Sequence, residues 1–307
     1  MEKFILNCAV TGAIHTPTMA PFLPLKPQDI ARQAVEAVQA GASTVHVHAR
    51  DPETGIPTGN IEVMGEIVST IHAKCDGIIC ITTGGGTNMT VDERIASVPR
   101  FKPELASLNL GSMNFGLFPV LAKFKEWKYP WEPMYLEGSK EFIFRNTFAD
   151  IDRILHVFQE NGTKPEFEAY DVGHLSNAHL FYSLGRIEEP FYVQFVMGIL
   201  GGISATFPHL LHLKQTADEL YKGGYFFSTI AAGRNEFALG TASLLLGGGA
   251  RVGLEDNLWL ERGRMAKCNA ELVEKMVRIA RELGYEPATP DETRRMLKLK
   301  GRDKVNM

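Results

Sequence analysis

Two histidines separated by a single residue, His46 and His48, lie in a short segment rich in β-branched residues, positions 44–51. Glycine precedes this segment at position 41, and proline and glycine follow at positions 52 and 55, so the pattern predicts a strand. Side chains alternate along a strand, so both imidazoles point to one face, about 7 Å apart, and can bind one metal ion. The alternative for the pair alone is an exposed strand that carries two histidines by chance.

A carboxylate that completes such a metal site follows much later in the chain, at Glu255. Two imidazoles and one carboxylate form an open zinc site, which leaves a position for substrate or water. Asp256, the residue after Glu255, points in a different direction and can act as a base beside the metal. Arg251 can bind an anion or keep Asp256 ionised. The alternative is that Arg251, Glu255 and Asp256 form only an ion-pair network at the end of the fold.

The segments that must position these residues alternate between strand and helix. This alternation is typical of a parallel sheet, and eight units predict an α/β protein with the (β/α)8 TIM-barrel fold rather than an open sheet. The expected strands are residues 4–11, 44–51, 77–82, 105–110, 165–171, 191–197, 225–232 and 250–254. The expected helices are residues 27–40, 61–74, 91–97, 150–161, 177–184, 208–221, 237–246 and 262–283.

In a barrel of this class the functional residues lie at the C-terminal ends of the strands. Glycines 84–86 follow the third strand, where backbone N–H groups can bind a carboxylate or phosphate, although many turns carry glycine only for backbone geometry. The strand ends are otherwise rich in polar residues. They include Thr11, His46, His48, Thr82, Ser107, Asn109, Glu166, Glu168, Asp171, Asn235, Glu236, Arg251, Glu255, Asp256 and Asn257.

One connection is too long for an ordinary βα loop. Residues 112–147, after the fourth strand, are rich in tryptophan, tyrosine, phenylalanine and proline. We interpret this insertion as a lid or an oligomer contact rather than a separate domain. The length of 307 residues would also allow two domains, but it suits a single barrel, so we expect one domain over residues 1–307 with a C-terminal helical tail at about 289–307.

Composition and charge narrow the function classes. The chain is 45% hydrophobic and 22% charged, with a formal net charge of −4, which predicts no binding to nucleic acid or to acidic membranes. The apolar run at the N-terminus is too short to span a membrane. The four cysteines are scattered without paired spacing, which is typical of free thiols in a reducing compartment, so we expect a cytoplasmic protein.

A series of motifs resembles the β-keto acid cleavage enzyme family over nearly the whole chain, apart from the aromatic insertion. In order along the chain these are AVTGA, HVHARDPETG, TTGGG, SLNLGSMNFG, PEFEAYDVGHL, GRNEF, RVGLEDN and CNAELVE. Joint occurrence of HxHxRD and RxGxED at this separation is highly specific. The resemblance implies a zinc-bearing (β/α)8 barrel, usually a homotetramer. It also implies the reaction of a β-keto acid with acetyl-CoA to give acetoacetate and a new acyl-CoA by Claisen and retro-Claisen steps.

The resemblance also implies roles for particular residues. It makes His46, His48 and Glu255 the ligands of one Zn²⁺ per subunit, and it places Asp256 as the base. Zinc in such a site polarises the keto oxygen as a Lewis acid. The remaining implied roles are Arg251 as partner of the base, Glu168 as a further acidic group facing the site, and Thr82, Gly85 and Ser107 as the positions that hold the substrate carboxylate.

One departure from the family pattern concerns the substrate's tail. The members that cleave 3-keto-5-aminohexanoate have an acidic residue directly after the TGA motif, where this chain has Ile14, followed by His15. An apolar side chain cannot pair with an ammonium group, and burial of that charge without a partner is costly. We therefore expect a β-keto acid with a neutral or apolar tail, or one that contacts His15.

Two other function classes remain open at this point. A metal-dependent hydrolase or aldolase that does not use CoA can also carry an HxH strand on this barrel, although such hydrolases need further His and Asp ligands on later strands. Here the corresponding positions hold Glu168 and Gly198. A binding or scaffold protein without catalysis would have no need to keep the metal-site residues together with Asp256. A reaction that is independent of CoA would favour the hydrolase or aldolase. Absence of bound metal would favour the binding or scaffold protein.

Overall fold

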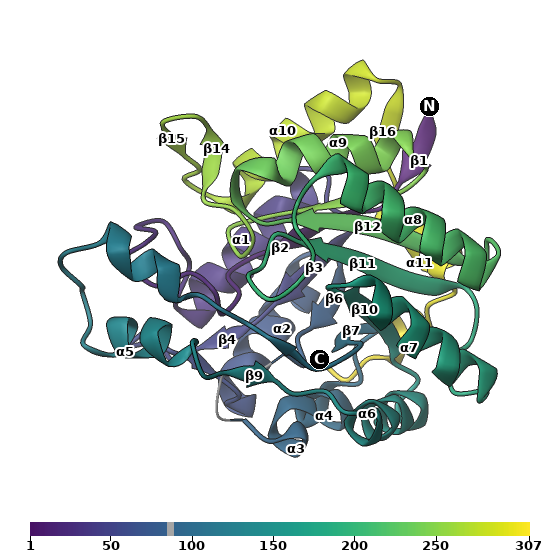
Figure 1. Ribbon diagram of the computed structural model, residues 1–307, viewed down its shortest axis with the longest axis horizontal. Helices are drawn as coiled ribbons and strands as arrows, with labels where there is room; N and C mark the ends of the chain where they lie inside the picture. The colour runs from purple at the N-terminus through teal and green to yellow at the C-terminus, as the bar shows by residue number, and fades with distance from the viewer. Residues whose placement is uncertain (85–88) are drawn as a thin grey trace.

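Eight parallel strands form a closed barrel in the computed structural model, which describes residues 1–84 and 89–307 (Figure 1). Each strand pairs with the next in chain order, and the last pairs with the first, so the TIM-barrel prediction is confirmed. The barrel strands are β2 (Leu6–Ala9), β3 (Thr44–Val47), β6 (Ile78–Ile81), β7 (Leu105–Asn109), β10 (Lys164–Ala169), β11 (Phe191–Met197), β12 (Tyr225–Ala231) and β13 (Gly249–Val252).

Helices surround the barrel, and local sequence signals set several of their ends. Pro27 begins the first helix, the Asn60 side chain caps the second, and Thr147 forms a capping box with Asp150. The helices are α1 (Pro27–Gln39), α2 (Ile61–Lys74), α3 (Val91–Ile95), α4 (Ser97–Phe101), α6 (Phe148–Glu160), α7 (Val172–Ser183), α8 (Phe207–Tyr221), α9 (Glu236–Leu245), α10 (Asn269–Glu282) and α11 (Pro290–Leu297).

The observed helices differ from the expected ones in three places. The helix expected at 91–97 is two short helices, α3 and α4, and α7 begins five residues before the expected start at 177. The helix expected at 262–283 begins only at Asn269, because an antiparallel hairpin, β14 (Trp259–Glu261) and β15 (Arg264–Met265), precedes it. Gly263 turns this hairpin with a φ of 81°, a backbone conformation that breaks a helix.

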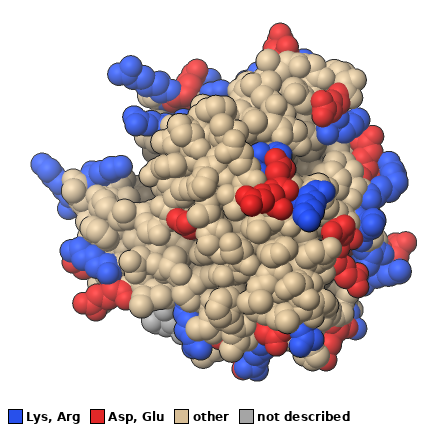
Figure 2. Space-filling view, turned by 45° about the vertical axis from the view of Figure 1, so that its right-hand side comes forward, with Lys and Arg blue, Asp and Glu red and all other residues tan. Residues whose placement is uncertain are grey.

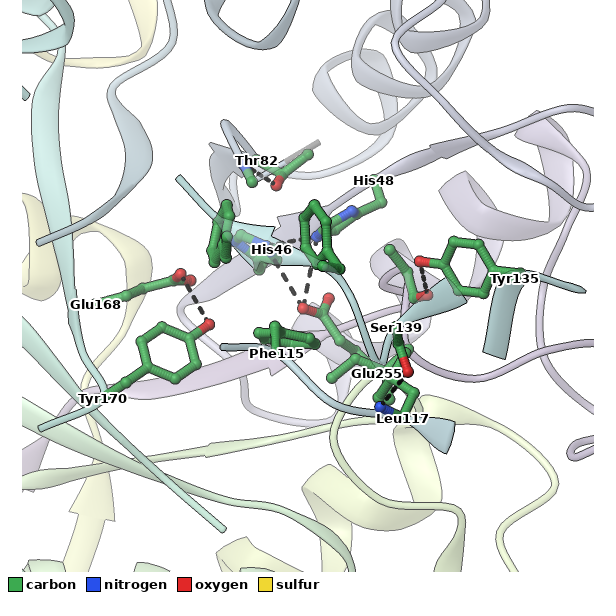
Figure 3. Close-up of a pocket in the computed structure, with 15 residues that line it drawn as sticks. His46, His48, Thr82, Phe115, Leu117, Tyr135, Ser139, Glu168, Tyr170 and Glu255 are labelled. Atoms are coloured by element: carbon green, nitrogen blue, oxygen red, sulfur yellow. Dashed lines mark hydrogen bonds and ion pairs between the residues drawn. The ribbon is translucent and has the colours of Figure 1, made fainter. Parts of the chain in front are cut away.

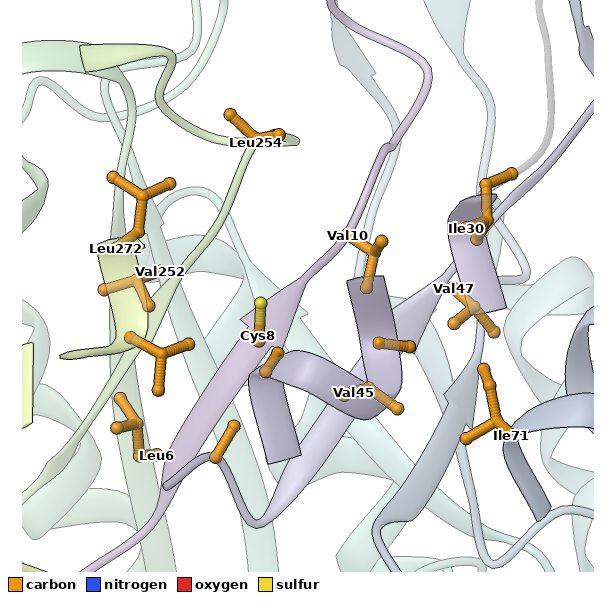
Figure 4. Packing of buried hydrophobic residues seen from close by; sticks show 14 of the residues in the cluster. Leu6, Cys8, Val10, Ile30, Val45, Val47, Ile71, Val252, Leu254 and Leu272 are labelled. Carbon is orange, nitrogen blue, oxygen red and sulfur yellow. The ribbon is translucent and has the colours of Figure 1, made fainter. Parts of the chain in front are cut away.

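The largest hydrophobic cluster lies between the first strands and the helices that cover them (Figure 4). Val45 and Val47 of β3 are fully buried there with Ile30 of α1 and Ile71 of α2. The valines thus face the helical layer, and the alternation along β3 turns the two histidines toward the inside of the barrel. The period-two pattern in the sequence predicted this division.

The insertion folds back over the mouth of the barrel rather than away from it. It contains β8 (Met113–Asn114), η1 (Phe118–Lys123), α5 (Trp131–Gly138) and β9 (Ile143–Phe144), with β8 and β9 paired antiparallel. Glu132 is buried and accepts hydrogen bonds from the backbone N–H and the hydroxyl of Thr18, at 2.9 and 2.8 Å. The Tyr135 hydroxyl donates to the Ala13 carbonyl at 2.9 Å. These bonds hold the insertion against the loop after β2.

Smaller elements complete the chain. β1 (Glu2–Phe4) pairs with β16 (Tyr285–Pro287), and β4 (Ala49–Arg50) pairs with β5 (Pro57–Thr58); η2 (Gly233–Asn235) and η3 (Arg302–Lys304) are single turns. Within the described residues, no helix is both long enough and apolar enough to span a membrane. Acidic and basic side chains are interspersed on the face shown in Figure 2.

Candidate active site

Three side chains predicted as metal ligands meet at the mouth of the barrel (Figure 3). The Nε2 atoms of His46 and His48 lie 3.1 Å apart. Glu255, from the loop after β13, places its Oε1 at 3.8 Å from Nε2 of His46 and 3.5 Å from Nε2 of His48. All three residues are buried. The structure therefore brings together residues that are about two hundred positions apart in the chain.

The donor set fits a zinc ion. Zinc–nitrogen and zinc–oxygen bonds of about 2.0–2.1 Å in a tetrahedral site place the ligand atoms about 3.4 Å from one another, close to the spacing of these three side chains. The Oε2 atom of Glu255 is buried and accepts no hydrogen bond within the described part of the chain. Burial also lowers the pKa of His46 well below its usual value, so its imidazole is neutral, as a metal ligand must be.

A second cluster, His46 with Cys80 and Glu166, lies one layer deeper in the barrel. Burial raises the pKa of both the Cys80 thiol and the Glu166 carboxyl, which disfavours the ionised forms that bind metal. Glu166 instead faces the other side of the histidine ring, with its Oε1 3.8 Å from Nδ1 of His46. Nδ1 of His46 makes no hydrogen bond among the described residues. The first cluster is thus the better candidate metal site.

The loop that carries Glu255 is held by close packing against the loop after β2. Gly12 has a φ of 60°, and a Cβ atom there would lie 2.2 Å from Cγ of Glu255, so a side chain at this position would displace the carboxylate. The Glu255 backbone N–H donates to the Ala9 carbonyl at 3.1 Å. The TGA motif therefore contributes to the site through backbone shape.

Two buried polar side chains outside the cavity hold the same loop. Asn269, the first residue of α10, accepts from the Leu254 backbone N–H at 2.9 Å and donates to the Val10 carbonyl at 3.0 Å. Glu236, at the start of α9, accepts from the Gly253 backbone N–H at 3.1 Å and from the Asn257 side chain at 3.0 Å. These contacts explain why the CNAELVE and GRNEF motifs accompany RVGLEDN in this chain.

Arg251, on β13, joins the acidic residues of the site. Its Nε donates to Oδ2 of Asp256 at 2.8 Å, and one terminal nitrogen donates to Asp256 and Glu255 at 3.1 and 2.8 Å. The other terminal nitrogen, NH1, lies 3.8 Å from Oε1 of Glu168 and makes no hydrogen bond in the described structure. Planar guanidinium geometry allows this multiple contact, which a lysine cannot reproduce. The arginine keeps three carboxyl groups in one small volume.

The environment gives these carboxyl groups different protonation behaviour. Burial opposes ionisation of Glu255, but His48 and Arg251 hold its pKa well below the usual value. Burial raises the pKa of Asp256, although Arg251 opposes this shift. Burial raises the pKa of Glu168 to about 8, so its carboxyl carries a proton at neutral pH without metal. Separated pKa values of this kind are typical of sites that transfer protons.

A cavity of about 80 Å³ lies above the histidines and receives side chains from both the barrel and the insertion (Figure 3). Two of the predicted substrate-binding residues, Thr82 and Ile14, line this cavity. Glu168, predicted as an acidic group facing the site, also lines it. The hydroxyl of Tyr170, another lining residue, donates to Glu168 at 3.3 Å. Ser107 does not line it, because its hydroxyl is buried and accepts from the Thr83 backbone N–H at 3.2 Å. Gly85 lies outside the described residues.

Sequence patterns did not identify the aromatic wall of this cavity. The insertion supplies several of its lining side chains, and Tyr170 adds one from the end of β10. The aromatic composition of the insertion was the one available signal, but it could not show which rings face the barrel. The lining residues that come from the insertion or its borders are Phe115, Leu117, Tyr135, Ser139, Phe142 and Phe144.

Asp256 does not line the cavity above the histidines. It lines a second cleft that shares Ile14 and Leu117 with the cavity. Arg251 connects the predicted base to Glu255, and Glu255 contacts both histidines. Because burial raises the pKa values of Cys8 and Cys80 well above normal, neither thiol is suited to nucleophilic catalysis.

The closed barrel with a polar cluster at the C-terminal ends of its strands defines a TIM-barrel enzyme. The family model for beta-keto acid cleavage enzymes matches residues 3–299. The chain therefore belongs to the β-keto acid cleavage enzyme family, as the sequence motifs predicted.

Individual relatives agree with this assignment. A 3,5-dioxohexanoate:acetyl-CoA acetone transferase from Paraburkholderia graminis is 48% identical over 99% of this chain and 98% of the relative. A 3-keto-5-aminohexanoate cleavage enzyme from Fusobacterium nucleatum is 36% identical over 98% of this chain and 99% of the relative. The solved structure of ObcA with oxaloacetate has a TM-score of 0.72 at 20% identity, covering 91% of this chain and 68% of ObcA, and supports the fold alone.

Proposed function

We propose that this protein is a zinc-dependent β-keto acid cleavage enzyme that converts a β-keto acid and acetyl-CoA into acetoacetate and a new acyl-CoA. The observation that carries the proposal is the convergence of His46, His48 and Glu255 within metal-binding distance, with Arg251 and Asp256 attached to the same carboxylate cluster. Membership of the family supports the reaction class. The donor set supports zinc, with one ion for each chain.

Bound at this site, Zn²⁺ would supply Lewis-acid polarisation of the substrate's keto oxygen. Asp256 removes a proton from C2, between the keto group and the carboxylate, and Arg251 keeps Asp256 ionised and oriented for this step. Thr82 lies where its hydroxyl can donate to the substrate carboxylate. The aromatic wall excludes water from the carbanion.

The remaining steps conserve atoms and charge. The C2 carbanion attacks the thioester carbon of acetyl-CoA, and the CoA thiolate leaves. The thiolate then attacks the former keto carbon, C3, and the C2–C3 bond breaks. The released carbanion takes back the proton held by Asp256, which gives acetoacetate, while C3 and the substrate's tail leave as the acyl-CoA. Glu168 lines the cavity beside Tyr170, and we propose that it faces the reacting oxygen atoms.

We propose that the substrate's tail is neutral, as in 3,5-dioxohexanoate. Ile14 packs in an apolar cluster with Tyr170, Val196 and Ile199, and it lines the cavity. An ammonium group beside this cluster would be desolvated without an acidic partner from position 14. The P. graminis relative acts, by its name, on 3,5-dioxohexanoate. With that substrate the products would be acetoacetate and acetoacetyl-CoA.

His15 does not supply a charge for recognition. Its Nδ1 lies 2.8 Å from the Leu254 carbonyl, and burial lowers its pKa to about 4. The imidazole is therefore neutral at physiological pH and fixed by the loop that carries Glu255. This favours the neutral-tail alternative over a tail that contacts a charged His15.

We also propose that the enzyme is a cytoplasmic homotetramer. The four cysteines are all free, which suits a reducing compartment. The mixed charge of the surface shown in Figure 2 gives no support for nucleic acid or membrane partners. Mass photometry at nanomolar concentration tests the tetramer directly, and a monomer would contradict it.

An assay of acetoacetate formation tests the reaction. The purified protein, with zinc content measured, is incubated with 3,5-dioxohexanoate with and without acetyl-CoA. We expect acetoacetate and acetoacetyl-CoA in equal amounts, only when acetyl-CoA is present, and loss of both with Asp256→Asn and His46→Ala. Cleavage without acetyl-CoA would instead identify a metal-dependent hydrolase or aldolase.

A further inference from the structure

A second cleft opens beside the candidate active site, with a volume of about 430 Å³. Its walls come from the η1 segment of the insertion, the β14–β15 hairpin, and the loops after β2, β11, β12 and β13. In Figure 1 the insertion and the hairpin both project to the left of the barrel. We refer to this space as the hairpin cleft.

The hairpin cleft reaches the reaction centre. Ile14 and Leu117 line both the cleft and the histidine cavity, and Asp256 lies in the wall of the cleft. The proposed reaction requires the base to be next to two substrates, because the carbon that it deprotonates must attack a thioester. In the proposed function the β-keto acid binds in the cavity above His46 and His48. The hairpin cleft is the space that gives access to Asp256, and it adjoins the histidine cavity at Ile14 and Leu117.

The cleft walls are apolar, and they remain exposed. Leu200 is 51% exposed and Trp259 is 43% exposed, which is unusual for large apolar side chains, and both line the cleft with Phe124 and Leu258. An exposed apolar surface with a catalytic group at its base is typical of a ligand site. An elongated, mostly uncharged chain fits such a surface.

Two exposed basic side chains belong to the segments that form the cleft. Lys123, the last residue of η1, lines the cleft and is exposed. Arg234 is exposed and directly follows Gly233, another lining residue. Neither forms an ion pair within residues 1–84 and 89–307. Basic groups without acidic partners at the edge of an apolar cleft suit a ligand with an uncharged arm and a phosphorylated end.

We propose that the hairpin cleft binds acetyl-CoA, with the pantetheine arm along Leu200 and Trp259, the thioester at Asp256, and the phosphates near Lys123 and Arg234. This inference rests on the proposed function, because it assigns the acyl donor's place in the same reaction. It also gives the insertion two roles, since residues around β8 and β9 cover the keto acid while η1 contacts the acyl donor.

The test measures kinetics for each substrate separately. Variants Lys123→Glu, Arg234→Glu and Leu200→Asp change the cleft without touching the histidine cavity. We expect the KM for acetyl-CoA to rise about tenfold in each, since a repulsive or polar group replaces a complementary one, while the KM for the keto acid and the zinc content stay unchanged. The effect of the two charge reversals should shrink in high salt. Lys125→Glu, on the same segment but outside the cleft, is the matched control.

Direct binding separates this inference from the proposed function. CoA alone is titrated against the zinc-loaded protein by calorimetry and by Trp259 fluorescence, with Trp259→Phe as the spectroscopic control. We expect weaker CoA binding in the three cleft variants. Normal acetoacetate formation with an unchanged KM for acetyl-CoA in all three would overturn the inference and leave the function standing. A change only in oligomer mass in Leu200→Asp would overturn it too, and would assign this surface to a subunit contact.

Absence of acetoacetate formation in the wild type refutes the proposed function. The binding experiment alone then tests whether the hairpin cleft binds CoA. CoA binding that the cleft variants weaken would still support the hairpin cleft as a CoA site. Failure of the wild type to bind CoA would overturn the inference.

Discussion

Arg251 and Asp256 form a two-point contact, in which Nε donates to Oδ2 at 2.8 Å and a terminal nitrogen donates to Oδ1 at 3.1 Å. Both residues are buried, and the pair links the last barrel strand to the loop that carries Glu255. Burial raises the pKa of Asp256, and the contact with Arg251 opposes this shift. Its removal should affect both chemistry and folding.

Arg251→Lys keeps the positive charge but loses the planar contact. We expect kcat to fall by about 100-fold or more, because a misplaced base loses most of its catalytic contribution. Arg251→Ala should also lower the free energy of unfolding by about 3–5 kcal/mol, since it leaves buried carboxylates without a partner. Steady-state kinetics and urea unfolding measure the two effects. A lysine variant with wild-type kcat would show that the guanidinium does not orient Asp256.

Metal removal should abolish activity and lower stability together. A chelator is expected to remove one zinc ion per chain, eliminate acetoacetate formation and lower the Tm, because an ion that binds only the folded state stabilises it. Re-addition of zinc should restore both properties. His48→Ala should bind less zinc and respond little to the chelator. Elemental analysis and thermal unfolding supply the readouts, and full activity in metal-free protein would contradict the zinc site.

Glu166 should act on the metal through His46. Its Oε1 lies 3.8 Å from Nδ1 of His46, on the side of the ring away from Glu255. A carboxyl oxygen in this place can accept the Nδ1 proton and orient the histidine ligand, and loss of such a partner typically weakens metal binding about 10- to 100-fold. We therefore expect Glu166→Gln to weaken zinc affinity by that amount, measured by competition with a chromogenic chelator.

Cys80→Ala is the matched control for Glu166, because the Cys80 thiol contacts Glu166 at 3.5 Å without facing Glu255. It should leave zinc affinity near the wild-type value. Equal losses in both variants would indicate a general packing defect in the barrel interior instead of an effect on His46.

Ile14 should set the preference for the substrate's tail. Ile14→Glu places a carboxylate in the cavity wall, and we expect it to raise kcat/KM for 3-keto-5-aminohexanoate relative to 3,5-dioxohexanoate by about tenfold or more. Ile14→Gln, which has similar size without charge, should not produce this reversal. Strong activity of the wild type on the amino substrate would refute the neutral-tail proposal.

His15 should make folding stability depend on pH in a defined window. Burial lowers its pKa from 6.5 to about 4 in the folded chain. Between these values the unfolded chain binds a proton that the folded chain does not, so this residue's contribution to stability is lost as pH falls from 6.5 to 4. His15→Asn keeps a donor for the Leu254 carbonyl and should lose less stability over this window. Urea unfolding at pH 7, 5.5 and 4.5 measures the difference, and parallel losses in both proteins would contradict it.

Local patterns were sufficient to predict the barrel and the meeting of His46, His48 and Glu255. The alternation of β3 assigned His46 and His48 to one face because side-chain direction in a strand follows from backbone geometry. The position of Glu255 after the last strand was enough to predict a meeting at the barrel mouth, because parallel strands in a closed barrel end on the same side. These inferences needed no knowledge of packing.

Only the tertiary structure decided which side chains enclose the substrate and how the loops are held. Nothing local distinguishes Phe115 and Phe144, which face the cavity, from other aromatic residues of the insertion. The position of Ser107 at a strand end predicted that it would face the cavity. Its hydroxyl instead accepts a hydrogen bond from the Thr83 backbone N–H. The cleft beside Asp256 arises where the insertion approaches a hairpin more than a hundred residues later. Such contacts depend on how distant segments pack, and periodicity along one segment carries no information about that.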